Sequence, residues 1–112
     1  MRQYKLSTKA DADISDIYRY GINNFGITIA KSYLVGLHNI SNKLKFYKEL
    51  WRPYFHIIHG LYKYNYKSHV VFFTEEEDYI FIVRILQKNE KINFYLDIKY
   101  FVFLKYYCFT FS

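Results

Sequence analysis

The chain has little of several residue types that mark specialised proteins: one cysteine, one proline and four glycines among 112 residues. A single cysteine, Cys108, excludes an internal disulfide. We find no glycine-rich phosphate loop, no nucleophile elbow and no zinc spacing with cysteines. His56 and His59 are three residues apart, but further metal ligands cannot be identified. We therefore expect no metal and no cofactor.

Membrane and export signals are also missing. The first 16 residues have no apolar segment and turn acidic quickly, unlike a secretory signal. The most apolar stretch, residues 92–112, is interrupted by Asp97, Lys99 and Lys105. A transmembrane helix needs about 20 consecutive apolar residues, and charges inside hydrocarbon are costly. We expect no membrane span and a cytoplasmic location.

Aromatic residues and positive charge are abundant instead. There are 14 tyrosines and 11 phenylalanines, so a chain of one-domain length can bury a full core. The net charge of +6 suits acidic partners such as nucleic acid or an acidic protein.

Two amphipathic helical patterns follow a short strand-like opening at residues 3–6. The first places Ala10, Ile14, Ile17, Gly21 and Phe25 at spacings of three and four. Three aspartates cluster in its early turns, where negative charge complements the helix dipole, and residues 23–26 (NNFG) provide the stop. The second pattern has its apolar side on Ile27, Ala30, Tyr33, Leu34, Leu37, Ile40 and Leu44. Since few residues separate the patterns, they predict an antiparallel helical hairpin.

A connector and then a sheet are predicted for the chain up to residue 86. Residues 45–60 break the periodicity and contain the proline, Pro53, which indicates a connector. The segment GLYKYNY alternates in character, and SHVVFF and YIFIVRIL are nearly continuous β-branched and aromatic runs. The order β-αα-βββ predicts an α+β domain in which the hairpin packs on a mainly antiparallel sheet. We assign this domain to residues 1–89 and an atypical aromatic-rich tail to residues 90–112.

His69 and Arg84 are polar residues within these apolar strands. If the acids of residues 75–78 (EEED) form the loop, Thr74 faces Tyr79, Phe73 pairs with Ile80, Val71 with Ile82, and His69 with Arg84. The six residues of the last three pairs would share one sheet face, and a slip of one residue would move the arginine to the other. Two interpretations remain open. Arg84 either reaches solvent or a carboxylate, with His69 at the rim, or the pair takes part in recognition or chemistry.

Positive charge is concentrated between residues 43 and 67, which carry six basic residues against one acid, Glu49. Arg52 and Lys63 lie within this stretch. Such a patch can track phosphates or capture an acidic peptide, and it can equally be a solvated surface that simply carries lysines.

Several ordered pieces of the chain resemble the ParE branch of the RelE/ParE toxin superfamily. They are YKLS (residues 4–7), AD-DI--IY-Y (10–20), FG (25–26), A--YL--L (30–37), RP (52–53), GLYKYNYKSHVVFF (60–73) and IFIVRIL (80–86). The pieces span residues 3 to 86 in the family's order. The resemblance implies a toxin of a type II toxin–antitoxin pair (a plasmid stabilisation protein) with a helical hairpin on an antiparallel sheet.

The resemblance also implies partners. One is a cognate antitoxin of the ribbon-helix-helix type, whose C-terminal segment wraps and neutralises the toxin. For the ParE branch the implied target is DNA gyrase, which is inhibited by binding so that cleaved DNA persists. The toxin alone is not expected to bind DNA sequence-specifically. Arg52, Lys63, His69 and Arg84 are the residues that we predict to contact target or antitoxin.

The RelE branch implies the alternative, a ribosome-dependent mRNA endonuclease. That reaction needs a base, cations and an acid, and Arg84 and His69 can supply two of these roles, with Lys63 or Arg52 holding a phosphate. The family pattern IVRILH, followed by MD, reads IVRILQKNEKIN here. Gln87 thus replaces a histidine, and glutamine cannot transfer protons near neutral pH. This favours gyrase inhibition over a nuclease.

The tail after Asn89 matches nothing in the family. One hypothesis is that a frameshift or fusion replaced the normal end, leaving an inactive toxin remnant that still binds antitoxin. Another is that the tail adds a strand or helix that covers the sheet.

Overall fold

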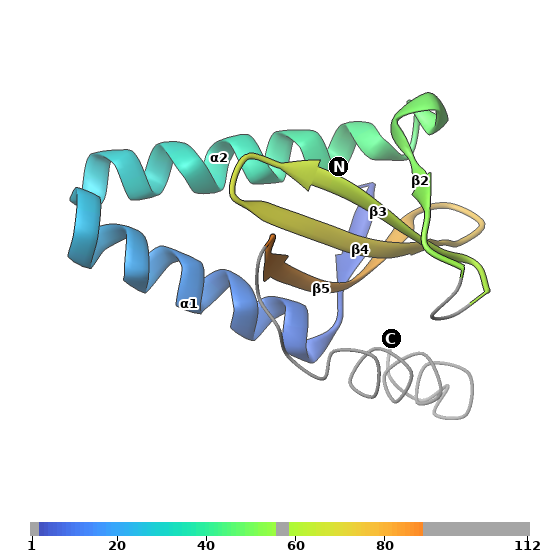
Figure 1. Ribbon diagram of the computed structural model, residues 1–112. Helices are drawn as coiled ribbons and strands as arrows, with labels where there is room; N and C mark the ends of the chain where they lie inside the picture. Colours follow the sequence, from blue (N-terminus) through green and yellow to red (C-terminus); the bar gives the residue numbers. More distant parts are fainter. Residues whose placement is uncertain (1–2, 56–58, 89–112) are drawn as a thin grey trace.

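The computed structural model describes residues 3–55 and 59–88. Two helices form an antiparallel hairpin on one side of a five-stranded sheet (Figure 1). Along the chain, β1 (Tyr4–Leu6), α1 (Thr8–Phe25) and α2 (Ile27–Leu44) come first, followed by the 3-10 helix η1 (Lys48–Leu50) and the strands β2 (Arg52–Pro53), β3 (Leu61–Tyr66), β4 (His69–Glu75) and β5 (Ile80–Gln87). The predicted α+β class and helical hairpin are confirmed. The predicted connector additionally contains η1 and β2.

The helical hairpin has clear start and stop signals. Ser7 caps α1 by accepting a hydrogen bond from the backbone N–H of Ala10 at 2.9 Å, which satisfies one of the free donors of the first turn. Gly26 ends α1 and precedes α2 with φ of 89°, a left-handed value that glycine adopts at little cost. The two helices approach closely near the turn, where Gly21 has no Cβ. A Cβ added at Gly21 would lie only 3.1 Å from the Cβ of Ala30.

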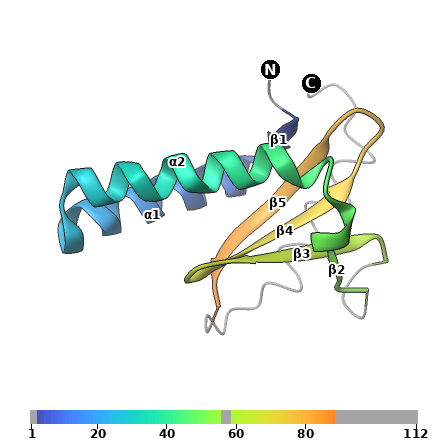
Figure 2. The same ribbon diagram turned by 90° about the horizontal axis from the view of Figure 1, so that it is seen from above.

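The turn end of the hairpin extends beyond the sheet, as Figure 2 shows. The inner part of the first predicted stripe is buried or half-buried through Ala10, Ile14 and Ile17. Its last member, Phe25, and the first residue of the second stripe, Ile27, are each more than half exposed. At this end of the hairpin the apolar stripes thus extend beyond the part of the helices that the described strands cover.

The sheet has the order β1-β5-β4-β3-β2. β1 pairs in parallel with β5, and the other neighbours are antiparallel. The face toward the helices carries the main core, which includes Val71, Phe73, Ile80 and Ile82 of the sheet together with Leu37 of α2. Phe73, Val71, Ile80 and Ile82 are completely buried, as expected for strands covered by a helical layer.

The register predicted for β4 and β5 is wrong. Glu75 belongs to β4, and the loop is residues 76–79, closed by a hydrogen bond from the Glu76 N–H to the Tyr79 carbonyl. The partner of Phe73 is therefore Ile82 instead of Ile80. Because this is a shift of two residues, Phe73, Ile80 and Ile82 stay on the sheet face that was predicted for them. Val71 pairs with Ile85 instead of Ile82, and Thr74 with Phe81 instead of Tyr79.

A β-bulge then separates His69 from Arg84. The register shifts between Phe72 and Phe73, so that β5 has one extra residue, Val83, at this point. Beyond it His69 pairs with Gln87, and Arg84 lies opposite Phe72. The predicted cross-strand pair of His69 and Arg84 does not form, because the shorter loop moves the partner of each β4 residue by two positions and the bulge moves it by one more. The odd total also changes the sheet face on which the β5 residues after the bulge lie.

Candidate functional site: a groove beside the helical hairpin

A groove of about 720 Å³ runs between α1, the hairpin turn and the end of β5. Its lining comes from α1, α2, the β3–β4 turn and β5, and includes Asp13, Ile29, Tyr33, His69 and Arg84. We call it the hairpin groove. It exists because the two helices continue past the sheet, which leaves their inner sides without a strand to pack on.

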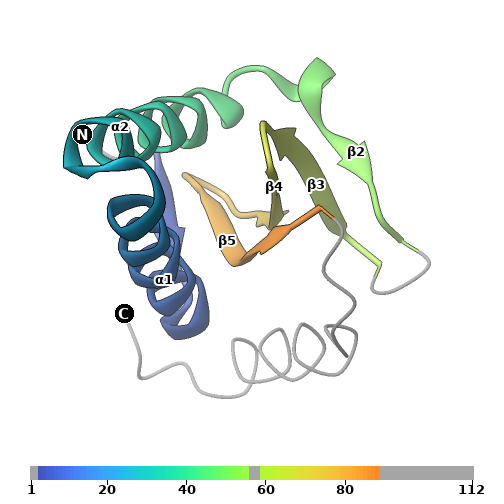
Figure 3. The same ribbon diagram turned by 60° about the vertical axis from the view of Figure 1, so that its left-hand side comes forward.

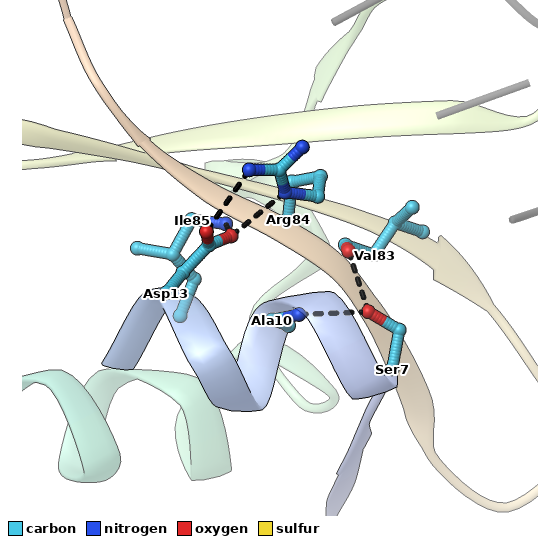
Figure 4. A network of polar contacts seen from close by, with 6 residues as sticks. All are labelled: Ser7, Ala10, Asp13, Val83, Arg84 and Ile85. Atoms are coloured by element: carbon cyan, nitrogen blue, oxygen red, sulfur yellow. Dashed lines mark hydrogen bonds and ion pairs between the residues drawn. The ribbon is translucent and has the colours of Figure 1, made fainter. Parts of the chain in front are cut away.

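The inner wall of the groove is an ion pair that joins helix to sheet. Asp13 on α1 accepts two hydrogen bonds from the Arg84 guanidinium, from Nε at 2.8 Å and from Nη2 at 3.0 Å (Figure 4). The same carboxylate accepts the backbone N–H of Ile85 at 2.9 Å. Arg84 is 7% exposed. A two-point Arg–carboxylate pair of this kind fixes orientation as well as charge.

The position of Asp13 follows from the short length of β1. β1 pairs with three residues of β5, Ile80 to Ile82, so among the described strands none continues along the edge of β5 beyond them. The start of α1 takes over this edge: the Ser7 hydroxyl donates to the Val83 carbonyl at 2.6 Å, and Asp13 accepts from Ile85. Backbone groups that would otherwise be unpaired are thereby satisfied.

Tyr33 and His69 form the outer rim of the groove. The Tyr33 hydroxyl and His69 Nδ1 share a hydrogen bond of 2.6 Å, and the two rings meet edge to face at 5.5 Å. Burial raises the pKa of the Tyr33 hydroxyl, against an opposing hydrogen bond from Ser68. The Lys67 ammonium lies 5.8 Å from the centre of the Tyr33 ring. This rim offers polar groups beside the apolar side chains that also line the groove, such as Tyr20, Phe25 and Ile29.

Exposed apolar side chains lie near the turn end of the helical hairpin, and three of them, Tyr20, Phe25 and Ile29, line the groove. Tyr20 and Phe25 of α1 and Ile27 and Ile29 of α2 are each more than half exposed. Tyr20 and Phe25 contact each other edge to face with centroids 6.3 Å apart. We call these four residues the apolar tip. Large exposed apolar side chains grouped beside a groove are typical of a site that a partner covers.

The other predicted contact residues lie elsewhere. Arg52 on β2 and Lys63 on β3 are cross-strand partners at the opposite side of the sheet from β1 and β5. Lys63 places its ammonium 5.1 Å from the centre of the Tyr54 ring, and Arg52 is exposed. We call this pair the basic edge. The structure thus brings His69 and Arg84 to one groove and Arg52 and Lys63 to another surface.

Much of the remaining positive charge in residues 43–67 is compensated. Lys45 donates hydrogen bonds to the carbonyls of Glu76 and Glu77, and Lys48 forms an ion pair with Glu75. The acidic β4–β5 loop therefore lies against these lysines, which makes part of the predicted patch a locally balanced surface.

Sequence reasoning missed three features of the groove: Asp13, Tyr33 and the exposure of the apolar tip. Asp13 was grouped with the dipole-compensating acids, but only Asp11 lies in the first turn of α1. A buried arginine in an apolar strand was the available signal, since such a charge requires a carboxylate. That interpretation of Arg84, pairing with a carboxylate, is confirmed.

The groove presents hydrogen-bonding and apolar side chains that can recognise a partner. Asp13 occupies two nitrogens of the Arg84 guanidinium, and Gln87, exposed beside His69, carries no titratable proton.

Among residues 3–55 and 59–88 no group of three or more His, Cys, Asp or Glu side chains is arranged to hold a metal. His56 lies outside the described residues. No helix in the described part of the chain is long and apolar enough to span a membrane.

Comparison with known proteins places this geometry in a family. Residues 4–92 match the family described as the ParE toxin of the type II toxin–antitoxin system parDE. Among solved structures, the fold resembles the chromosomal ParDE toxin–antitoxin system from P. aeruginosa with a TM-score of 0.66 and 21% identity, over 78% of this chain and 96% of that one. A comparison with curated protein sequences finds no match. Because the family match covers most of the chain, this protein belongs to the ParE toxin family of type II toxin–antitoxin systems.

Proposed function

We propose that this toxin inhibits DNA gyrase by binding it, and that a cognate antitoxin of the ribbon-helix-helix type neutralises the toxin by docking in the hairpin groove. Membership of the ParE family is the observation that carries the proposal. The solved relative is described as a chromosomal ParDE toxin–antitoxin system. By analogy, we propose that this chain also has an antitoxin partner.

The apolar tip supports the groove as the antitoxin site. Four large apolar side chains that are more than half exposed leave a surface whose burial would stabilise a complex. An amphipathic segment laid along α1 could cover the tip with its apolar side and reach the polar rim of Tyr33 and His69 with its other groups. The groove offers both kinds of contact within one surface.

The basic edge is our proposed contact with the target. Arg52 is exposed, and Lys63 lies directly across the β2–β3 pair from it. Gyrase bound to DNA is an acidic complex, and a chain of net charge +6 would be steered toward it. The basic edge and the hairpin groove are separate surfaces, so a substitution in one can be tested while the other stays intact.

The nuclease alternative receives less support from the geometry. A 2′-hydroxyl transfer needs a cation free to approach the phosphate, whereas the Arg84 guanidinium is 7% exposed and held by Asp13 through two hydrogen bonds. His69 already shares its Nδ1 with Tyr33. In a translation extract we therefore expect full-length mRNA in the presence of the toxin. Truncated mRNA would instead support the nuclease.

A matched pair of α2 variants tests the antitoxin site. Ile29 and Val35 are β-branched residues on the same helix, 56% and 58% exposed, but only Ile29 lines the groove. Losing a buried isoleucine side chain removes about 1.5–3 kcal/mol, or roughly 10- to 100-fold in affinity. We expect Ile29→Ser to weaken binding of the antitoxin encoded beside the toxin gene by that factor in calorimetry, and Val35→Ser to bind normally. Equal affinities would remove the groove from the proposal.

A second pair tests the target contact. Arg52→Ser should raise the toxin concentration needed to halve gyrase supercoiling, while Lys31→Ser, at an exposed lysine of α2, should leave it unchanged. Both proteins should bind antitoxin like the unmodified chain. If Arg52→Ser inhibits supercoiling as well as the unmodified chain does, the basic edge is not the target contact.

A further inference from the structure

A chain of hydrogen bonds fastens the N-terminal strand to α2. The backbone N–H of Gln3 donates to the Asn42 Oδ1 at 2.9 Å, and the amide nitrogen of Asn42 lies 3.2 Å from His38 Nε2. The other ring nitrogen, His38 Nδ1, lies 2.7 Å from the Tyr4 hydroxyl oxygen. The rings of Tyr4 and His38 also meet edge to face, with their centroids 5.6 Å apart. We call Gln3, Tyr4, His38 and Asn42 the β1 clasp.

The β1 clasp joins the edge of the sheet to the helical layer. Both helices lie on one side of the sheet (Figure 3), and β1 is the edge strand beside β5. His38 and Asn42 are four residues apart on α2, so their side chains project from the same face of that helix. Tyr4 is 6% exposed and belongs to the main core, which places its hydroxyl in an apolar layer. A buried hydroxyl requires a hydrogen-bond partner, and His38 provides one.

The donors and acceptors of the clasp can be assigned in one way only. A backbone N–H can only donate, so the Asn42 atom that faces Gln3 is the amide oxygen, and the group that faces His38 is the NH2. His38 Nε2 therefore accepts a hydrogen bond and carries no proton. A neutral imidazole has its proton on the other nitrogen, so Nδ1–H donates to the Tyr4 hydroxyl. The clasp thus holds His38 as the neutral Nδ1–H tautomer.

A second proton on His38 would disrupt this arrangement. An imidazolium has N–H groups at both nitrogens, so Nε2–H would point at the NH2 group of Asn42, donor against donor. Turning the Asn42 amide over would give Nε2–H an acceptor, but it would place the NH2 group against the N–H of Gln3. Either arrangement loses one of the two hydrogen bonds that Asn42 makes in the clasp.

Three further elements contribute to the surroundings of His38. Tyr4 of β1, Asp11 of α1 and Ile85 of β5 line the same cavity, and the other α2 residues that line it are uncharged. Asp11 is exposed, so water screens its negative charge. A tyrosine hydroxyl carries no charge at the pH values where histidines titrate. The hydrogen-bond geometry at Asn42 therefore decides how the clasp responds to acid.

We propose that the β1 clasp is an acid-sensitive latch, which holds β1 on the sheet while His38 is neutral and loosens β1 when His38 takes up a second proton. The Gln3 carbonyl accepts from the Ile80 N–H at 3.1 Å, and the Ser7 N–H donates to the Ile82 carbonyl at 2.9 Å. These two hydrogen bonds tie the ends of β1 to β5. When the latch opens, the edge of β5 from Ile80 to Ile82 becomes accessible to water. The inference concerns the attachment of β1 and does not depend on gyrase inhibition.

Nuclear magnetic resonance on the ¹⁵N-labelled full chain tests the latch. At about pH 7.5 we expect the ring ¹⁵N shifts of His38 to be those of the Nδ1–H tautomer. Between about pH 7.5 and 5.5 we expect the amide protection factors of Ser7 and Ile80 to fall about 10-fold, because the clasp loses a hydrogen bond. Amides in the centre of β4 should keep their protection factors. Ring shifts of the Nε2–H tautomer, or equal protection of Ser7 and Ile80 at both pH values, would overturn the proposal.

A substitution at Asn42 should remove or reverse the response to acid. Asn42→Asp replaces the NH2 group with a second acceptor, so the carboxylate can accept from the Gln3 N–H and from a protonated His38 at the same time. In this variant the protection of the β1 amides should stay constant or rise as the pH falls. His59→Gln, at an exposed histidine outside the clasp, is the matched control and should respond to pH like the unmodified chain. If Asn42→Asp loses as much protection as the unmodified chain, the latch is wrong.

Discussion

Replacing Asp13 with alanine should be among the most damaging single changes on the surface of α1. The carboxylate accepts two hydrogen bonds from Arg84 and one from the Ile85 N–H, so one substitution leaves a guanidinium and a strand-edge donor without their acceptor. The two charged side chains retain only 9% and 13% of their exposure. Removing one partner of a buried pair costs about 3–5 kcal/mol, and we take about 3 because some water contact remains.

Urea unfolding followed by circular dichroism measures this loss, since guanidinium chloride would screen the pair. The free energy of unfolding of a domain of this size is about 5–15 kcal/mol, so the variant loses a large share of its stability. With an m value of about 1–3 kcal/mol/M, the midpoint should fall by roughly 1–3 M. Asp16→Ala is the control: its pair with Arg19 is 69–73% exposed and should contribute under about 1 kcal/mol.

A double variant separates lost charge from lost packing. Combining Asp13→Ala with Arg84→Met removes both charges, and we expect it to be more stable than Asp13→Ala alone, because no buried guanidinium then lacks the carboxylate that balances its charge. A midpoint for Asp13→Ala within about 0.3 M of that of Asp16→Ala would refute the assignment of Arg84 as a buried, paired charge.

Three further predictions concern other contacts. Ser7→Ala should lower the unfolding free energy by about 1–2 kcal/mol, measured in urea, because the hydroxyl both caps α1 and donates to the Val83 carbonyl. Gly36→Ala should be destabilising in the same assay, although alanine normally favours a helix by about 0.5–1 kcal/mol, since the new Cβ would lie 2.0 Å from the Tyr66 hydroxyl oxygen. Adding Tyr66→Phe should recover most of that loss, and no recovery would contradict the reasoning. Because burial raises the pKa of Tyr33, the folded protein keeps this proton at pH values where the unfolded chain loses it, so stability should fall above about pH 10. The stability of the Tyr33→Phe variant should fall less over the same pH range. If its stability falls as much as that of the unmodified chain, the result would count against the burial of this hydroxyl.

The sequence patterns identified the layers of the fold but not its local irregularities. Apolar spacing located both helices and their turn, and β-branched runs located β4 and β5, because burial on a sheet or against a helix dictates these periods. The bulge at Val83 leaves no such signal, since IFIVRIL is apolar on both faces. The register after the bulge, and with it the partners of His69 and Arg84, was therefore beyond pattern reasoning.

The candidate site could be predicted only in part for a related reason. His69 and Arg84 stood out as polar residues in apolar strands, and both line the hairpin groove. Periodicity also assigned Phe25 and Ile27 to the apolar stripes, but it does not specify how far a helix continues past its sheet. The exposure of the apolar tip depends on that relation between helix and strand lengths.

Trapped gyrase cleavage complexes test the central claim most directly. The purified toxin is incubated with gyrase, ATP and supercoiled plasmid, and the reaction is stopped with detergent and protease. We predict linear plasmid that increases with toxin concentration, requires gyrase and disappears when the antitoxin is added first. Plasmid that stays supercoiled or circular at every toxin concentration, with folded protein confirmed by circular dichroism, would contradict the account.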